Sequence, residues 1–370
     1  MILLKEENFK DKWSFDKDYL RSVIIKGKRK LESETLSREE RKSIKCDIET
    51  FERFIMDDYE VADNGYNKKR IPKNIDRLKN YILRKMARQY KILGEDLIKW
   101  ILDLIDSEIF ADKFDSSLEF TELSLSEIAF LTIKNYEVNS PKFLPYAKRI
   151  ILDDSIRQIQ LVDSIGSHCH HDDITNESYI LYDVTEPTCL LNHEVQHAIE
   201  ALFKYPTNIL YCELGPIVYE LLFNDELYKL KGNLQEGDIA FRTNDTDYLF
   251  DSLYGYFQIL LVFAEKNFDI STEEFLETFL IIEEINPELL EDYLREEIAS
   301  DEKIEDMNYL FSYLKAIELR EKMNLNKHDN EILEPYMRRR AFHFQRPKDD
   351  FRLYERYVEE MKQKVRKRSK

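Results

Sequence analysis

Glycine and proline are scarce in this chain, at 8 and 9 of its 370 residues. Both residues interrupt helices and build tight turns, so their scarcity favours helices over a turn-rich β fold. No internal repeat and no low-complexity linker is visible, and the sequence therefore indicates no flexible domain boundary. We expect a mainly α-helical protein.

Cysteine is also rare, and the four cysteines are widely scattered without a CxxC pair: Cys46, Cys169, Cys189 and Cys212. Reduced thiols in a cytoplasmic protein are the simplest interpretation. No apolar run approaches the roughly 20 residues of a membrane span. The first residues also lack the basic and apolar regions of a signal peptide. We therefore expect a cytoplasmic protein without a membrane partner.

Positive charge is in the minority, since 55 Lys and Arg stand against 73 Asp and Glu, for a net charge of −18. A phosphate backbone would be repelled by such a surface, so we expect no nucleic-acid partner. The hydrophobic share of 43% is enough for a sizeable core in one large or two modest domains.

Two histidines four residues apart form the most informative pattern of the chain, His193-Glu194-Val195-Gln196-His197. On a helix this spacing puts both imidazoles on one face, where they can hold one zinc ion while Glu194 points toward a metal-bound water. The alternative is an incidental exposed helix face. The pattern predicts metal-dependent hydrolysis, most often of a peptide bond.

The flanking residues predict a strand before the motif and a helix through it. Residues 178–184 are rich in β-branched and aromatic side chains, and residues 185–187 suit a turn. The helix continues to Phe203, until Pro206 ends it. This order is typical of zinc peptidases in which an edge strand pairs with the substrate backbone.

A catalytic zinc usually takes three protein ligands, and Glu213 is the best candidate for the third. It follows a turn at residues 206–208 that would let a second helix fold back beside the first. Glu220 lies seven residues later, two helical turns on, so both carboxylates would face the zinc helix. We predict that Glu220 accepts the other N–H of a ligand imidazole. A solvated carboxylate at Glu213 and a structural role for Glu220 are the alternatives.

These segments resemble the thimet oligopeptidase and oligoendopeptidase F family, the M3-clan zinc oligopeptidases. Residues 179–198 look like that family's edge strand and HExGH helix, with Gln196 where the family usually has Gly. Residues 213–220 are similar to its E-x-[AP]-S-x-x-x-E segment, whose first Glu is the third zinc ligand. The spacing from His197 to Glu213 is shorter than the family usually has, which implies a tighter loop. The resemblance covers about residues 175–265.

The resemblance also implies an active-site helix rich in tyrosine, where a hydroxyl stabilises the oxyanion. Tyr256 is the expected donor, with Tyr254 or Tyr248 as substitutes, and such a donor contributes about 3 kcal/mol. An aromatic stripe of the core is the alternative. The family carries a His shortly before this cluster, and the nearest aligned position here is Asn244, with Tyr248 close by.

The expected mechanism follows from these roles. His193, His197 and Glu213 hold one Zn²⁺, and Glu194 accepts a proton from the zinc-bound water and later delivers it to the leaving amine.

A rival cluster, residues 167–173, packs three histidines, a cysteine and two aspartates together: His168, His170, His171, Cys169, Asp172 and Asp173. His- and Cys-rich tracts can bind metals. Because these residues are adjacent rather than spaced along one helix face, we expect a loop near the cleft rim and no second metal site.

The expected fold is mainly α: a gluzincin-like helical catalytic domain with a small β-sheet beside the HExxH helix. Residues 1–150 would form a helical N-terminal part and one wall of the cleft, with helices starting at Ser37 and spanning residues 75–105. Residues 151–370 would form the zinc-peptidase part with a helical C-terminal region. Its predicted elements include a strand within residues 156–165 and helices at residues 273–280 and 307–316.

The leading prediction is therefore a cytoplasmic zinc metallopeptidase that hydrolyses short peptides, because the resemblance implies a helical enclosure around the zinc. A catalytically degenerate relative that binds a peptide or partner protein without turnover is the second. A regulatory metalloprotease with one protein target is the third. The sequence indicates neither the subsite preferences nor the oligomeric state.

Overall fold

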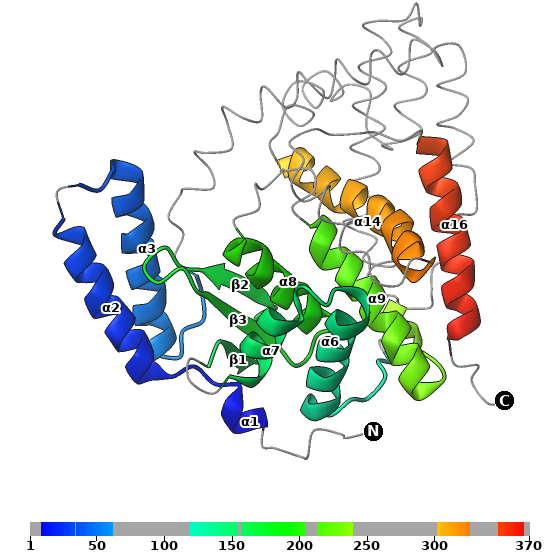
Figure 1. Ribbon diagram of the computed structural model, residues 1–370, viewed down its shortest axis with the longest axis horizontal. Helices are drawn as coiled ribbons and strands as arrows, with labels where there is room; N and C mark the ends of the chain where they lie inside the picture. Colours follow the sequence, from blue (N-terminus) through cyan, green and yellow to red (C-terminus); the bar gives the residue numbers. More distant parts are fainter. Residues whose placement is uncertain are drawn as a thin grey trace, which may run out of the picture.

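The computed structural model describes residues 9–33, 35–61, 119–153, 157–203, 213–239, 302–325 and 347–365, and this part is mainly helical (Figure 1). Its helices are α1 (Phe9–Lys12), α2 (Lys17–Leu31), α3 (Arg38–Ile55), α6 (Leu125–Asn139), α7 (Leu144–Leu152), α8 (Leu190–Leu202), α9 (Leu214–Lys231), α14 (Glu302–Leu325) and α16 (Pro347–Lys364). Its strands are β1 (Ile159–Val162), β2 (His168–His171) and β3 (Ser178–Asp183). None of the described helices is long and apolar enough to cross a membrane.

The three strands form one small mixed sheet in the order β1-β3-β2. β1 pairs with β3 in parallel, and β2 pairs with β3 in antiparallel fashion. The strand predicted within residues 156–165 is thus present as β1. The strand predicted before the HExxH helix is present as β3.

The expectation that β3 is an edge strand is wrong, because it lies between β1 and β2. Every residue of β3 is buried. A strand covered on both faces carries a nearly continuous apolar run, and Tyr179–Tyr182 is such a run. The expectation of a loop at residues 167–173 is also wrong in part, since His168–His171 form β2. Backbone pairing with β3 outweighs the low strand preference of these polar residues.

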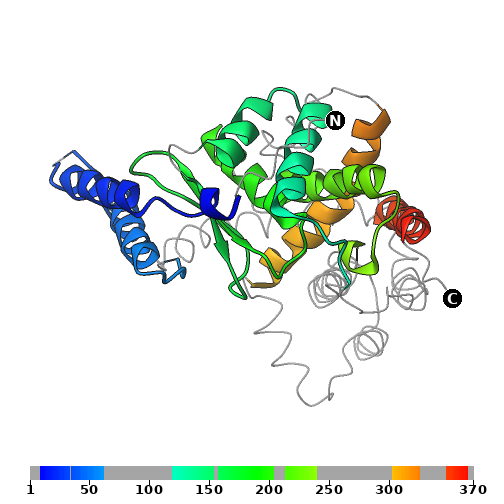
Figure 2. The ribbon, with the colours of Figure 1, turned by 90° about the horizontal axis from the view of Figure 1, so that it is seen from below.

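Side chains of β3 alternate between two hydrophobic cores. Ile180 and Tyr182 belong to the larger core, which includes α8 and α9, whereas Tyr179 and Leu181 belong to a smaller core with α2 and α3. The α2–α3 hairpin therefore covers one face of the sheet and α8 the other. In both views the hairpin projects from one side of the molecule (Figures 1 and 2).

The helix predicted to start at Ser37 is present as α3, and it begins with a capping box. The Ser37 hydroxyl accepts a hydrogen bond from the backbone N–H of Glu40, and the Glu40 carboxylate accepts one from the backbone N–H of Ser37. Such a cap stabilises a helix end by about 1 kcal/mol.

On the far side of α8, the helices α9, α14 and α16 follow one another away from the sheet (Figure 1). The helix predicted at residues 307–316 lies within α14. An ionic network around the buried Arg320 joins the three: Arg320 donates to both carboxylate oxygens of Asp225, at 2.7 and 2.6 Å, and to Glu360 at 3.2 and 2.8 Å. The helices predicted at residues 75–105 and 273–280 lie outside the described residues.

Candidate metal centre

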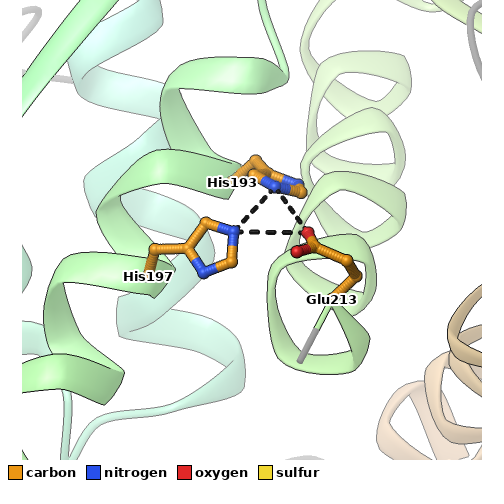
Figure 3. Close-up of side chains that lie close together, drawn as sticks. All are labelled: His193, His197 and Glu213. Carbon is orange, nitrogen blue, oxygen red and sulfur yellow. Dashed lines mark hydrogen bonds and ion pairs between the residues drawn. The ribbon is translucent and has the colours of Figure 1, made fainter. Parts of the chain in front are cut away.

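Helix α8 carries both motif histidines on the face that it turns toward α9 (Figure 3). The chain enters α8 through a turn in which the backbone N–H of Leu190 donates to the carbonyl of Pro187 at 2.9 Å. His193 is buried and His197 is partly exposed. The i, i+4 spacing therefore does what the sequence predicts, and places two imidazoles side by side.

Glu213 reaches the same point from the other helix. It is the residue immediately before α9, with φ −92° and ψ −4°, and its backbone carbonyl accepts from the N–H of Ile217 at 3.0 Å. Its position as the N-cap of a helix that packs against α8 aims the side chain at the two imidazoles (Figure 3). The loop before it, residues 204–212, lies outside the described residues, as does the predicted turn at residues 206–208.

The three candidate ligand atoms form a small, nearly equilateral triangle. Nε2 of His193 lies 3.1 Å from Nε2 of His197, and Oε2 of Glu213 lies 3.2 and 3.3 Å from these two nitrogens. Zinc bonds of 2.0–2.1 Å in tetrahedral geometry separate neighbouring ligand atoms by about 3.3 Å. Two imidazole nitrogens and a carboxylate oxygen at these separations therefore fit one zinc ion, with the fourth position left for water.

Glu220 contacts the other nitrogen of the first histidine, as its predicted role requires. Its Oε1 lies against Nδ1 of His193, and the carboxylate is almost fully buried. In the neutral imidazole that would bind a metal, an Nδ1–H that donates to Glu220 leaves Nε2 of His193 with a free lone pair, directed toward His197 and Glu213. The two helical turns from Glu213 to Glu220 place a candidate ligand at the start of α9 and, on the same face, a carboxylate that contacts another candidate ligand.

The charges of the cluster stabilise one another: the carboxylates favour protonated imidazoles, and the imidazoles favour ionised carboxylates. Burial alone would lower the pKa of His193, but Glu220 and Glu213 outweigh it and raise that pKa to about 10. Burial likewise would raise the pKa of Glu213, but the two imidazoles hold it well below its ordinary value. Without a metal, protons on the imidazoles balance the carboxylates, and a divalent cation would take their place.

Glu194 is buried beside the triangle, and burial raises the pKa of its carboxylate above the ordinary value, against the effect of His193 and His197. A carboxylate with a raised pKa is suited to accept and return a proton near neutral pH. Burial and then the nearby charge of Glu194 raise the pKa of Cys169 in β2, so β2 passes close to this part of α8.

A second group of hydrogen-bonded polar side chains, which the sequence does not predict, joins α6 to α8. The Tyr136 hydroxyl donates to Oε1 of Gln196 at 3.1 Å, and Nε2 of Gln196 donates to Oε1 of Glu200 at 2.9 Å. Burial raises the pKa of Glu200 to about 7, against the effect of His197. The available signal was spacing: Glu200 follows His193 by seven residues and His197 by three, which places it on the same helix face.

The histidines of β2 do not assemble a comparable group. Nε2 of His170 lies 3.3 Å from Oδ1 of Asp47, and its ring meets Phe51 and Phe54 edge-on. Nδ1 of His171 lies 2.9 Å from the Ser178 hydroxyl. Within the described ranges, one group of three His, Cys, Asp or Glu side chains has ligand atoms that all lie close together, and it consists of His193, His197 and Glu213.

The predicted oxyanion donors Tyr248, Tyr254 and Tyr256, and the position Asn244, lie outside the described residues, so their roles stay predictions.

No protein family model matches this chain, and comparisons with curated proteins and with solved structures return no match. The interpretation of the site therefore depends on its own residues and geometry.

Proposed function

We propose that this protein is a zinc-dependent metallopeptidase that hydrolyses short peptides, similar in its chemistry to the thimet oligopeptidase and oligoendopeptidase F family. The observation that carries the proposal is the triangle of His193, His197 and Glu213 beside the buried carboxylate of Glu194. Those are the groups that zinc-dependent hydrolysis needs, in the order along the chain that the HExxH motif sets.

Each residue then has a defined task. His193, His197 and Glu213 would hold the zinc, which when bound lowers the pKa of water to near neutral and polarises a carbonyl oxygen. Glu194 accepts the proton of the attacking water and returns it to the leaving amine. Glu220 holds His193 in the orientation that exposes Nε2.

The sheet supplies a position for the substrate backbone. Since β3 is central, the outer strands of the described sheet are β1 and β2, and we assign the peptide to β2 because it packs against the motif helix α8. Backbone pairing along β2 would bind peptides with little dependence on their sequence. This proposal replaces β3 with β2 as the substrate strand and keeps the predicted mode of binding.

The presence of Gln196 in place of Gly does not favour the alternative of a binding protein without turnover. Its side chain is fully buried and bonded to Tyr136 and Glu200, on contacts that leave the ligand triangle intact. The substitution of Gly by Gln at this position is therefore accommodated by packing between α6 and α8.

The test combines metal analysis with turnover of a quenched-peptide library. Wild-type protein is expected to bind one zinc per chain and to cleave peptides, and Glu194→Gln is expected to keep the zinc and to lose cleavage. Glu49→Gln, the same change at an exposed position of α3, is the matched control and should behave as wild type. Zinc binding without cleavage of any peptide would favour the non-catalytic binding protein, and cleavage of one protein alone would favour the regulatory protease. Retained turnover in Glu194→Gln would refute the mechanism.

A further inference from the structure

Glu200 occupies the space where the side chain of residue 215 would begin. A Cβ built on Gly215 would lie 1.9 Å from Oε1 of Glu200 and 3.3 Å from Nε2 of Gln196. The first distance is far below any real contact, so residue 215 must be glycine as long as Glu200 keeps this position.

A hydrogen bond from Gln196 holds the carboxylate of Glu200 in this position. Gln196, one turn earlier on α8, donates to its Oε1 at 2.9 Å, and the Tyr136 hydroxyl of α6 donates to Gln196 at 3.1 Å. The Tyr136 ring in turn stacks on Tyr219 of α9, with ring centroids 4.6 Å apart. Glu200 is thus the last member of a chain of contacts that joins α6 and α8 to the start of α9.

Gly215 is two residues from Glu213 and lies in the first turn of α9. Negative charge is favourable at this end of a helix, since the first backbone N–H groups carry partial positive charge. The end of the Glu200 side chain therefore lies beside the start of the helix that presents the third ligand candidate.

Placement of this helix end has a direct chemical consequence. Oε2 of Glu213 lies 3.2 and 3.3 Å from the two imidazole nitrogens. Metal sites tolerate deviations of only about 0.2 Å in their bond lengths. A shift of the α9 start by the length of one C–C bond would therefore take Oε2 of Glu213 out of bonding distance of a zinc held by His193 and His197.

We infer that Glu200 and Gly215 form a positioning pair that sets how closely α9 approaches α8, and so holds Glu213 at bonding distance from a zinc on His193 and His197. The inference depends on the proposed zinc site. It assigns a role to two residues outside the proposed ligand set.

The experiment is a double-mutant cycle on the full chain, with zinc affinity measured by competition with a chelator. Gly215→Ala is expected to weaken zinc binding by tenfold or more, because the hydrogen bond from Gln196 holds the Glu200 carboxylate in place and the new methyl group then displaces the helix start instead of the carboxylate. Glu200→Ala is expected to weaken it by less, about threefold. The double variant Glu200→Ala/Gly215→Ala is expected to bind zinc at least fivefold more tightly than Gly215→Ala alone, because the second change removes the clash.

Two further variants separate positioning from folding. Gly232→Ala makes the same change at the other end of α9, where φ is +80° and no atom lies within 4 Å, so it should lower the melting temperature and leave zinc affinity within twofold. Glu200→Gln keeps an oxygen that accepts from Gln196 and should bind zinc within threefold of wild type.

The outcomes distinguish the inference from the proposed function. Wild-type protein that binds no zinc overturns both. Wild-type protein that binds zinc while Gly215→Ala binds it equally well overturns the inference alone, as do single effects that simply multiply in the double variant. If Gly215→Ala does not fold, the expected result is recovery of folded, zinc-binding protein in the double variant, and failure to recover it overturns the inference.

Discussion

Oε1 of Glu220 lies against Nδ1 of His193, on the side of the ring opposite to the ligand triangle. Glu220 of α9 thereby holds the His193 ring in place, while Glu213, the residue before the same helix, faces the other ring nitrogen. Loss of such an orienting group typically costs 10–100-fold in metal affinity.

Glu220→Gln is accordingly expected to weaken zinc binding by about tenfold, because the neutral amide interacts less strongly with the imidazole N–H. Competition with a chelator measures the change. Glu226→Gln is the matched control, since Glu226 lies on the same helix and pairs with Lys229 at 2.6 Å instead. Equal zinc affinity in wild type and Glu220→Gln would show that this contact does not orient a ligand.

Zinc affinity is expected to rise with pH. Burial would lower the pKa of His193, but the carboxylates of Glu220 and Glu213 raise it to about 10, so the imidazole carries a proton on both nitrogens at neutral pH in the metal-free protein. Zinc must displace that proton, and each rise in pH makes the displacement easier. Titration calorimetry in buffers of different ionisation enthalpy should record proton release between pH 6 and 8. Binding that is independent of pH over this range would contradict the protonated state of His193.

Asp183 is expected to stabilise the protein against acid. Its carboxylate accepts from the backbone N–H groups of Ile165, Gly166 and Thr185 at 2.7, 2.8 and 2.9 Å. Burial would raise its pKa, but these bonds and one from the Thr185 hydroxyl lower it to about 2. The resulting stabilisation is present above the ordinary pKa near 4 and is lost as the pH falls toward 2.

Asp183→Asn should therefore lower the free energy of unfolding by about 2 kcal/mol at pH 6, and the difference should shrink as the pH approaches 2. Urea unfolding at a series of pH values measures it. Asp163→Asn is a suitable control, because this exposed residue directly follows β1 and its carboxylate accepts a hydrogen bond from the neighbouring Ser164 hydroxyl at 3.1 Å. A constant difference at all pH values would mean that the charge of Asp183 is not the cause.

Arg320 is expected to be the most costly single ion to remove from the α9–α14–α16 network. Its side chain is 3% exposed and its partner Asp225 is 7% exposed, so truncation leaves a buried carboxylate without its bidentate donor. Arg320→Ala should lower the free energy of unfolding by about 3–5 kcal/mol. Arg356→Ala, which breaks a surface pair with Glu321 at a 63% exposed side chain, should cost less than about 1 kcal/mol. Similar costs in the two variants would refute the distinction.

The sequence predicted local features of the site well, since each depends on neighbours along one helix. The spacing of His193 and His197 determines a common face, and the separation of seven positions from Glu213 to Glu220 determines another. The cap at Ser37 is local in the same sense. Glu200 could also have been found from its spacing, but nothing in the sequence says that its carboxylate lies where residue 215 has no side chain.

The strand order was beyond local reasoning. Residues 178–183 carry the composition of a buried strand, but composition does not specify which strand pairs on which side. The histidines at residues 168–171 were expected in a loop because their side chains are polar, whereas hydrogen bonds from the β3 backbone make them a strand.

By itself, then, the sequence determined a mainly helical chain and the donor types of a candidate metal centre, because periodicity and residue chemistry are local properties. Only the tertiary structure decided that β3 is central, that Glu213 meets the two imidazoles at 3.2 and 3.3 Å, and that Glu200 fits against Gly215. These relationships join segments separated by loops, and their distances are set by how the helix faces pack rather than by any spacing along the chain.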